Sequence, residues 1–371
     1  MAAGQVHCDS RWKGIMRTAL AVAIALLVTA QVAASSRESW VAEAEVPGAT
    51  LRIEVLRPVD DEKAAEIVEW LRSASGNVSL AYGRFPNPSP RIVVIPTGNR
   101  SWGGDSPVPF GRVTRNGEEK IELYVNADRP IEEFYDDWTA THEFSHLMLP
   151  YIGERHRWIS EGFASYYQNV LMSRAGRYTA QDAWRKLSAG FERGRASRPE
   201  LSPNEAASAG VRQARMKIYW SGAAVALLAD IELRERSGGR ESLDVVLDRL
   251  QRCCLPSNRT WSGPELFSKL DSLVDDAVFM PLYRRYANEA GFPDTRRAFS
   301  RLGVEVDGRG VRLRADAELA DIRSAITDVA ELQEAETTYR QRCPIVPDSY
   351  CNPLEDEPCL QNSCSALSFS R

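Results

Sequence analysis

The sequence predicts an α+β fold in which a small sheet comes first and a mainly helical half follows. Runs of β-branched and aliphatic residues at 50–56 and 91–95 are typical of strands. Residues 111–125 hold two further strand-like runs around Asn116-Gly117, a dipeptide that favours a hairpin turn. From residue 130 on, apolar side chains recur at helical spacing instead.

The remaining elements follow from the same periodicities. An amphipathic helix is expected at 61–75, between the first two strands. The prolines and small residues of 195–209 predict a loop, and Asp307-Gly308 predicts the turn of a last short hairpin. In the second half, helices are expected at 131–149, 160–174, 180–193, 211–236, 242–252 and 264–290.

Composition is that of a folded protein. The chain has 371 residues, of which 43% are hydrophobic and 26% charged, with a formal net charge of −5. That length suggests two domains or one large unit. Lysine and arginine are nowhere concentrated together with interleaved aromatic residues, so a nucleic-acid or anionic-membrane surface is not expected.

The first residues have the order of a secretory signal. Arg11, Lys13 and Arg17 precede the apolar run Ala19–Val28, which leads to the small residues Ala33-Ala34. We therefore expect a signal peptide at about 1–34 and a secreted or periplasmic protein. An uncleaved anchor is the alternative. After the signal we expect an N-terminal α/β region with the hairpin (35–130), a mainly helical catalytic region (131–335) and a cysteine-rich irregular tail (336–371).

Six cysteines remain once Cys8 is assigned to the signal. An even number in an exported chain predicts three disulfides. A bond between the neighbours Cys253 and Cys254 is excluded here as strained, and the other pairings stay open. The remaining four cysteines lie in the tail, at Cys343, Cys351, Cys359 and Cys364.

The segment from His142 to His146 reads His-Glu-Phe-Ser-His, an HExxH motif on an expected helix that the acidic pair Asp136-Asp137 opens. Four residues advance a helix by about 400° and about 6 Å, so both imidazoles project from one face and can bind one zinc ion. Glu143 lies between them, where its carboxylate can act on water and not on the metal.

A hydrolytic zinc site needs a third protein ligand and an open position. Glu161, near the start of the next expected helix, can supply the ligand. His156 and Glu154 also follow the motif and compete for this role. A metzincin would need a glycine three residues and a histidine six residues after His146, where the chain has Leu149 and Ile152.

The HExxH motif together with Trp158, Glu161, Gly162, Ala164 and Tyr166 resembles the gluzincin zinc metallopeptidases, in particular their peptidase MA-like and glycyl-aminopeptidase branches. This resemblance implies a thermolysin-like catalytic fold: a small sheet whose edge strand lines the cleft, the HExxH helix, and a helical second half. One departure is that only fourteen residues separate His146 from Glu161, a shorter connection than aminopeptidase N relatives usually have.

The resemblance extends to Tyr219 and Gly222, which match the Y-x-x-G helix of gluzincins and imply that the Tyr219 hydroxyl stabilises the oxyanion. The alternative for Tyr219 is packing on an amphipathic helix, with Gly222 allowing close approach. Ser165 and Asn169 are candidates to hydrogen-bond the ligand histidines, although ordinary helix surface is their simpler assignment.

The sequence thus predicts an exported hydrolase with one Zn²⁺ per chain, held by His142, His146 and Glu161, in which Glu143 is the general base. Its partner would be a peptide or protein substrate. The absence of an amine-anchoring G-x-M-E-N strand slightly favours an endopeptidase over an aminopeptidase. A silent zinc-fold scaffold is the alternative from another class, and intact Glu143 argues against it.

Overall fold

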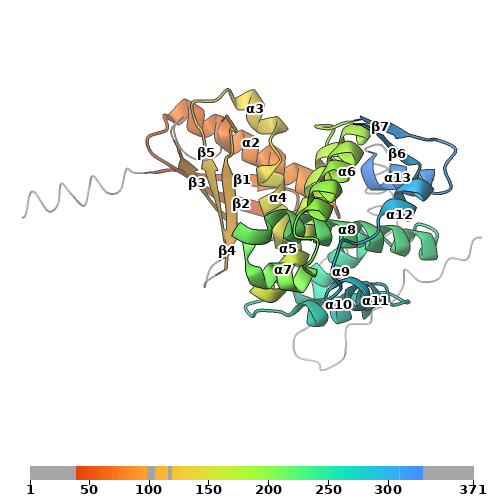
Figure 1. The fold of residues 1–371 in the computed structure, drawn as a ribbon. Helices are drawn as coiled ribbons and strands as arrows, with labels where there is room; N and C mark the ends of the chain where they lie inside the picture. The colour runs from red at the N-terminus through yellow and green to blue at the C-terminus, as the bar shows by residue number, and fades with distance from the viewer. Residues whose placement is uncertain (1–38, 98–104, 116–118, 309, 329–371) are drawn as a thin grey trace, which may run out of the picture. The chain divides into compact units, whose positions relative to one another are not determined.

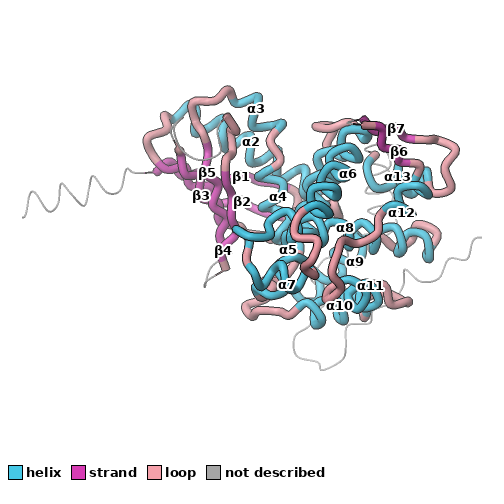
Figure 2. Tube along the Cα trace, viewed as in Figure 1, coloured by secondary structure: helices cyan, strands magenta, loops and turns pink. Residues whose placement is uncertain are grey.

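The computed structural model describes residues 39–97, 105–115, 119–308 and 310–328, and these divide into two compact units (Figure 1). The first unit comprises the described residues up to Ala74 together with Asn87–Ala140. The second comprises Ser75–Pro86 and the described residues from Thr141 on. The predicted α+β class is confirmed, because a small sheet precedes a mainly helical half (Figure 2).

The first unit is built on a five-stranded sheet in the order β1-β2-β3-β5-β4. The outer pairs β1–β2 and β4–β5 are antiparallel, whereas β2–β3 and β3–β5 are parallel. Strand β1 was not predicted, and the turn of the predicted β4–β5 hairpin lies outside the described residues. The elements are β1 (Ser39–Val46), β2 (Ala49–Leu56), β3 (Arg91–Pro96), β4 (Phe110–Thr114), β5 (Lys120–Val125) and α3 (Ile131–Asp136).

One face of this sheet is apolar, and the other mixes apolar residues with charged ones such as Arg52 and Glu54 of β2. Leu51, Ile53 and Val55 alternate along β2 and are fully buried, as period-two patterning requires. Residues of α2 (Asp61–Ser79), which the unit boundary divides, add Trp70 to this core, where its ring packs edge-on against Phe134 at 5.1 Å.

The second unit is helical. It holds α5 (Arg157–Arg174), α6 (Ala180–Ala196), α7 (Pro203–Ala209), α8 (Val211–Ser237), α9 (Leu243–Cys254), α10 (Gly263–Asp271), α11 (Phe279–Tyr286), α12 (Arg296–Leu302) and α13 (Ala320–Thr327), with the hairpin β6 (Val304–Asp307) and β7 (Gly310–Leu313). The predicted turn at Asp307-Gly308 is confirmed by this hairpin.

The helices α5 and α8 form the centre of this unit and run in the same direction. Gly162, near the beginning of α5, meets Gly222 in the first half of α8, and the Tyr166 hydroxyl donates to Asp230 Oδ2 at 2.6 Å further along both helices. Helix α5 is accordingly buried along most of its length, and Trp158 is fully enclosed.

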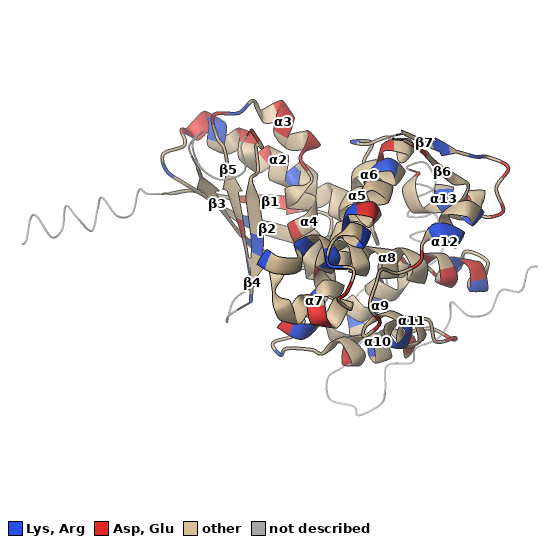
Figure 3. Cartoon of the chain, in the orientation of Figure 1, with Lys and Arg blue, Asp and Glu red and all other residues tan. Residues whose placement is uncertain are grey.

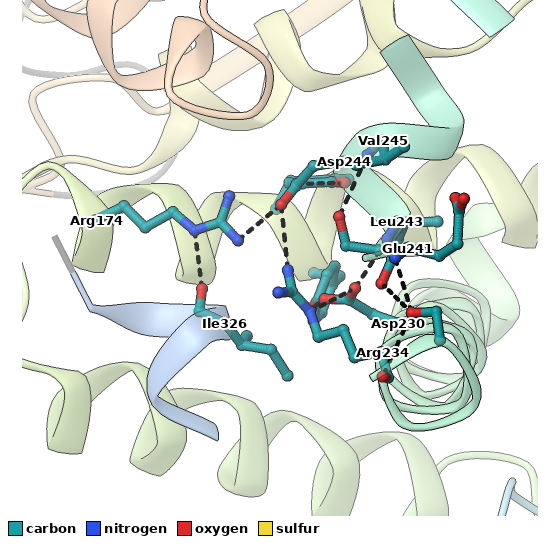
Figure 4. A network of polar contacts seen from close by, with 12 residues as sticks. Arg174, Asp230, Arg234, Glu241, Leu243, Asp244, Val245 and Ile326 are labelled. Carbon is teal, nitrogen blue, oxygen red and sulfur yellow. Dashed lines mark hydrogen bonds and ion pairs between the residues drawn. The ribbon is translucent and has the colours of Figure 1, made fainter. Parts of the chain in front are cut away.

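A buried, charge-balanced network joins the later turns of these helices (Figure 4). Arg234 Nε donates to Asp230 Oδ1 at 3.0 Å within α8. Asp244 Oδ2, on α9, accepts from Arg174 Nη2 at 2.9 Å and from Arg234 Nη2 at 3.3 Å. Arg174 Nε also donates to the carbonyl of Ile326 on α13 at 2.8 Å. Two arginines and two aspartates thereby bind four helices together.

Two helix predictions and one loop prediction were wrong in their bounds, each because a side chain bonds to backbone groups. The predicted helix 131–149 breaks at Asp137, whose backbone is extended and whose carboxylate accepts from Thr139 N at 2.7 Å. The predicted helix 264–290 breaks after Asp271, whose carboxylate accepts the N–H groups of 278–280. In the predicted loop 195–209, Ser202 and Glu205 form a capping box that begins α7.

Cys253 and Cys254 are joined as a disulfide, so excluding this pairing was wrong. The two residues are the last of α9, where the backbone leaves the helix at Leu255 and is less constrained than inside it. The other four cysteines of the predicted framework, and the predicted signal, lie outside the described residues. In the part of the chain that is described, no helix has the length and apolarity needed to cross a membrane.

Candidate metal centre

The HExxH motif occupies α4 (Thr139–Ser145) and the short 3-10 helix η1 (His146–Met148). Of the acidic pair predicted to open this helix, Asp137 accepts a hydrogen bond from Thr139 N at its beginning, whereas Asp136 is the last residue of α3. Phe144 is fully buried and packs edge-on against Phe85, with ring centroids 5.4 Å apart. At the other end, Gln251 Nε2 of α9 donates to the Leu147 carbonyl at 2.7 Å. The packing of Phe144 and the hydrogen bond to the Leu147 carbonyl thus hold in place the backbone that carries the two histidines.

The structure brings His142, His146 and Glu161 together, with one possible ligand atom from each lying within 4.8 Å of the others. Glu161 Oε2 lies 3.4 Å from His142 Nε2 and 3.6 Å from His146 Nε2. Zinc bonds of about 2.0–2.2 Å in a tetrahedron would separate neighbouring ligand atoms by about 3.4 Å. The three side chains therefore fit a zinc ion.

Glu161 gives a second test of this fit. Its Oε2 atom is buried and has no hydrogen-bond partner in the described residues. Burial alone would raise the pKa of this carboxyl, but His146 and His142 outweigh it and hold the pKa well below its usual range. A charged oxygen left without a hydrogen bond costs free energy, and a cation at this position would remove that cost.

Glu143 lies between the two histidines in sequence and is buried. Burial raises the pKa of its carboxyl, against the opposing effect of His142 and His146, while Glu161 raises it further. A carboxylate with a raised pKa is a better proton acceptor from water near neutral pH than an ordinary exposed glutamate. This environment suits the general base that the motif predicts.

The outer nitrogens of both imidazoles contact side chains of α5. His142 Nδ1 lies 2.7 Å from Gln168 Oε1, and His146 Nδ1 lies 3.0 Å from Ser160 Oγ. An Nδ1–H that donates to the Gln168 oxygen leaves the lone pair of His142 Nε2 free for a metal. One helix therefore supplies the candidate third ligand and a partner for each histidine.

Neither partner was predicted. The candidates Ser165 and Asn169 are both buried, so their assignment to helix surface was wrong, and Asn169 Nδ2 donates to the Ser165 carbonyl at 2.8 Å. Spacing on α5 could have indicated Gln168, because it lies seven residues, or two turns, after Glu161 on the same face.

Tyr219 comes to the centre from α8. Its ring stacks on that of His142, with centroids 5.8 Å apart and an angle of 7° between the planes. Burial raises the pKa of its hydroxyl, and the carboxylates of Glu161 and Glu143 raise it further, so the hydroxyl keeps its proton at neutral pH. A protonated phenol beside the candidate ligands can donate a hydrogen bond to a developing oxyanion.

The rival ligands lie elsewhere. His156 and Glu154 belong to the 3-10 helix η2 (Glu154–His156), and neither joins the three-residue cluster. The ring of His156 faces Tyr283, 6.1 Å away, and also borders Gly263. Glu154 is exposed and pairs with Arg157. His156 is thus a packing residue at the beginning of α5.

The known proteins were compared with this chain at the levels of sequence and structure. Residues 151–225 match the family model described as M61 glycyl aminopeptidase, a segment that includes Glu161 and Tyr219. No curated protein matches the sequence. An aminopeptidase N family protein from Idiomarina loihiensis aligns with a TM-score of 0.54 and 15% identity, covering 73% of this chain and 50% of that one.

A second solved structure, an M1 zinc metallopeptidase from Deinococcus radiodurans, aligns with a TM-score of 0.45 and 15% identity, covering 69% of this chain and 52% of that one. The chain thus spans about half the length of these two proteins. At such identity the first similarity establishes a common fold and nothing further. The match over residues 151–225 and this shared fold agree with the predicted resemblance to the gluzincin zinc metallopeptidases.

Proposed function

We propose that the protein is a zinc-dependent peptidase with His142, His146 and Glu161 as its metal ligands. The observation that supports this most directly is the convergence of two imidazole Nε2 atoms on the buried, otherwise unpartnered Glu161 Oε2. A scaffold without turnover would not need Glu143 buried beside these ligands or Tyr219 stacked on one of them.

Each residue then has a role in peptide hydrolysis. Zinc, when bound, would polarise the peptide carbonyl and acidify water. Glu143 accepts a proton from the attacking water and later returns it to the leaving amine. The Tyr219 hydroxyl donates a hydrogen bond to the carbonyl oxygen as negative charge develops there.

The type of peptidase is a separate question. We infer an aminopeptidase from the match to the M61 glycyl aminopeptidase model over residues 151–225. The missing G-x-M-E-N strand had slightly favoured an endopeptidase, but that motif belongs to another branch of the group. Peptides with free and acetylated N-termini distinguish the two, because an aminopeptidase cleaves only the free form.

The test combines metal analysis with turnover. The purified protein should contain one zinc per chain and cleave members of a diverse peptide library, and a chelator should abolish cleavage until zinc is restored. Glu143→Gln should keep the zinc and lose the cleavage. A zinc-loaded wild-type protein that cleaves no peptide would contradict the proposal.

We also propose export, on the strength of the basic and apolar residues before Ala34. N-terminal sequencing of the protein from its natural host should find a chain that begins near Ser35. A chain that begins at Met1 would support the uncleaved-anchor alternative.

A further inference from the structure

Arginine side chains lie one helical turn before two residues of the candidate centre. We propose that Arg157 and Arg215 make this centre selective for peptides with an acidic side chain or a carboxylate close to the scissile bond. The proposal rests on the proposed peptidase function and specifies its substrate class.

Arg157 is the first residue of α5 and lies four residues before Glu161. Residues four apart lie above one another on the same face of a helix. The Arg157 side chain is 35% exposed and lies one turn before Glu161 on the same helix. Arg157 is thus near enough to the centre to influence it, yet reachable from solvent.

Arg215 repeats this arrangement on α8. It lies four residues before Tyr219, in the regular part of the helix that follows the kink at Ala214. Its side chain is exposed, and no acidic side chain of the described residues pairs with it. An exposed arginine without an internal partner is available to bind an anion.

The packing of the helices places both arginines at the same end. Because α5 and α8 run in the same direction and meet at Gly162 and Gly222, the turn of α5 that holds Glu161 and the turn of α8 that holds Tyr219 are adjacent. Glu161 and Tyr219 project from those turns into the metal centre, and Arg157 and Arg215 lie one turn further toward the helix beginnings. A peptide that reaches Glu161 and Tyr219 would therefore pass two guanidinium groups.

The surrounding sequence has the same sign of charge, although the whole chain is acidic. Residues 193–217, which end α6 and begin α8, contain six lysines and arginines but only two glutamates, Glu200 and Glu205. Figure 3 shows blue segments together with a few red ones in this part of the helical unit. A local positive potential attracts anionic substrates even when the net charge is negative.

Acidic side chains nearby do not cancel these charges. Glu154 pairs with Arg157 at 2.5 Å, but the Glu154 side chain is 62% exposed. Exposed ion pairs of this kind contribute little free energy, so a substrate carboxylate can replace Glu154. Glu200 pairs with Arg198 and its charge also acts on Lys217, but among the described residues it forms no ion pair with Arg215. Arginine also suits the task because its planar guanidinium binds a carboxylate through two N–H groups.

The experiment uses the zinc-loaded full chain and pairs of peptides that differ only by Glu against Gln at each position around a cleaved bond. In wild type, kcat/KM should favour the acidic peptide by about tenfold at one position or more. Arg157→Gln and Arg215→Gln should each reduce this ratio, and the double variant should bring it close to one. Replacing both arginines by lysine should restore much of it.

The matched control is Arg240→Gln, which removes one exposed positive charge at the far end of α8 and should leave the ratio unchanged. A second readout is the affinity of the same peptides for the zinc-loaded Glu143→Gln protein. It should favour Glu peptides and lose that preference as salt rises.

The outcomes separate this inference from the proposed function. Cleavage of neutral peptides without any acidic preference would overturn the role of the arginines and leave the peptidase intact. A preference for acidic peptides that persists when both arginines are replaced by glutamine would also overturn their role and leave the peptidase function intact. If the wild-type protein cleaves no peptide, the proposed peptidase function fails. Separately, if the zinc-loaded Glu143→Gln protein binds Glu and Gln peptides with equal affinity, the role of the two arginines is overturned.

Discussion

Gly162 of α5 and Gly222 of α8 meet backbone to backbone. A Cβ added to Gly162 would lie 2.2 Å from the Gly222 Cα, and one added to Gly222 would lie 1.9 Å from the Trp158 carbonyl oxygen. No side chain other than hydrogen fits at either position. This contact lets Tyr219, one turn before Gly222, reach the histidine pair next to Glu161.

We predict that Gly222→Ala forces α8 away from α5. The free energy of unfolding should fall by about 1–3 kcal/mol, as for other overpacked cores, and kcat should fall with it because Tyr219 moves. The control is Gly76→Ala in α2, where an added Cβ meets nothing within 4 Å; it should stabilise by about 0.5–1 kcal/mol. Denaturant melts of both variants measure this. Equal effects would contradict the close contact.

We predict that zinc occupancy depends on Glu161 and not on His156. Glu161→Ala removes one of three ligands and should lower zinc affinity strongly, whereas His156→Ala should leave the metal in place because His156 packs against Tyr283. Elemental analysis after dialysis against a weak chelator gives the answer. Loss of zinc from the His156 variant alone would reassign the third ligand.

We predict that Gln168→Ala weakens zinc binding by about 10–100-fold, since His142 then loses the group that orients its ring. Gln213→Ala, at an exposed position on α8, is the matched control and should bind zinc normally. Competition with a chelating dye measures both affinities. An unchanged affinity for the Gln168 variant would show that burial alone orients the ring.

We predict that Glu143→Gln and Tyr219→Phe both keep their zinc but differ in turnover. Loss of one oxyanion donor typically lowers kcat by about 10²–10³, so Tyr219→Phe should fall in that range with little change in KM. Glu143→Gln should be at least as severe, because no other positioned group accepts the proton. Near-normal kcat in Tyr219→Phe would return this ring to the packing role.

We predict that the network in Figure 4 makes folding acid-sensitive. Burial would raise the pKa of Asp230, but Arg234, the Leu243 N–H and the Tyr166 hydroxyl hold it below its usual range. The ionised Asp230 carboxylate therefore contributes fully to the free energy of unfolding above its unfolded pKa of about 3.9. This contribution is lost as pH falls through the lower pKa of the folded state.

Asp230→Asn should accordingly destabilise the protein by about 3 kcal/mol at pH 7, because the buried Arg234 then keeps only its longer contact with Asp244 Oδ2, at 3.3 Å. The difference from wild type should shrink progressively as pH falls below about 4, and it should disappear only below the lower folded pKa of Asp230. Urea melts across this range measure it. Asp276→Asn, at an exposed position, is the control, and a difference that stays constant with pH would exclude Asp230 as the titrating group.

The sequence by itself determined the parts of the centre that depend on neighbours along one helix. Four-residue spacing places His142 and His146 on one face of a helix whatever surrounds them. The helical spacing of apolar residues after 160 likewise predicts that Glu161 lies near the beginning of the next helix. The alternation of apolar and polar residues along β2 and the turn at Asp307-Gly308 also depend only on residues close together in the sequence. Each of these was predicted because adjacent residues dictate it.

Only the tertiary structure decided how the helices meet. The contact of Gly162 with Gly222 joins positions sixty residues apart, and it is this contact that brings Tyr219 to His142. The pairing of His142 with Gln168 likewise depends on how α5 packs against the motif helix. Sequence periodicity shows which face of a helix is buried but not what it is buried against, because the energy of packing depends on the shape of a partner far away in the chain.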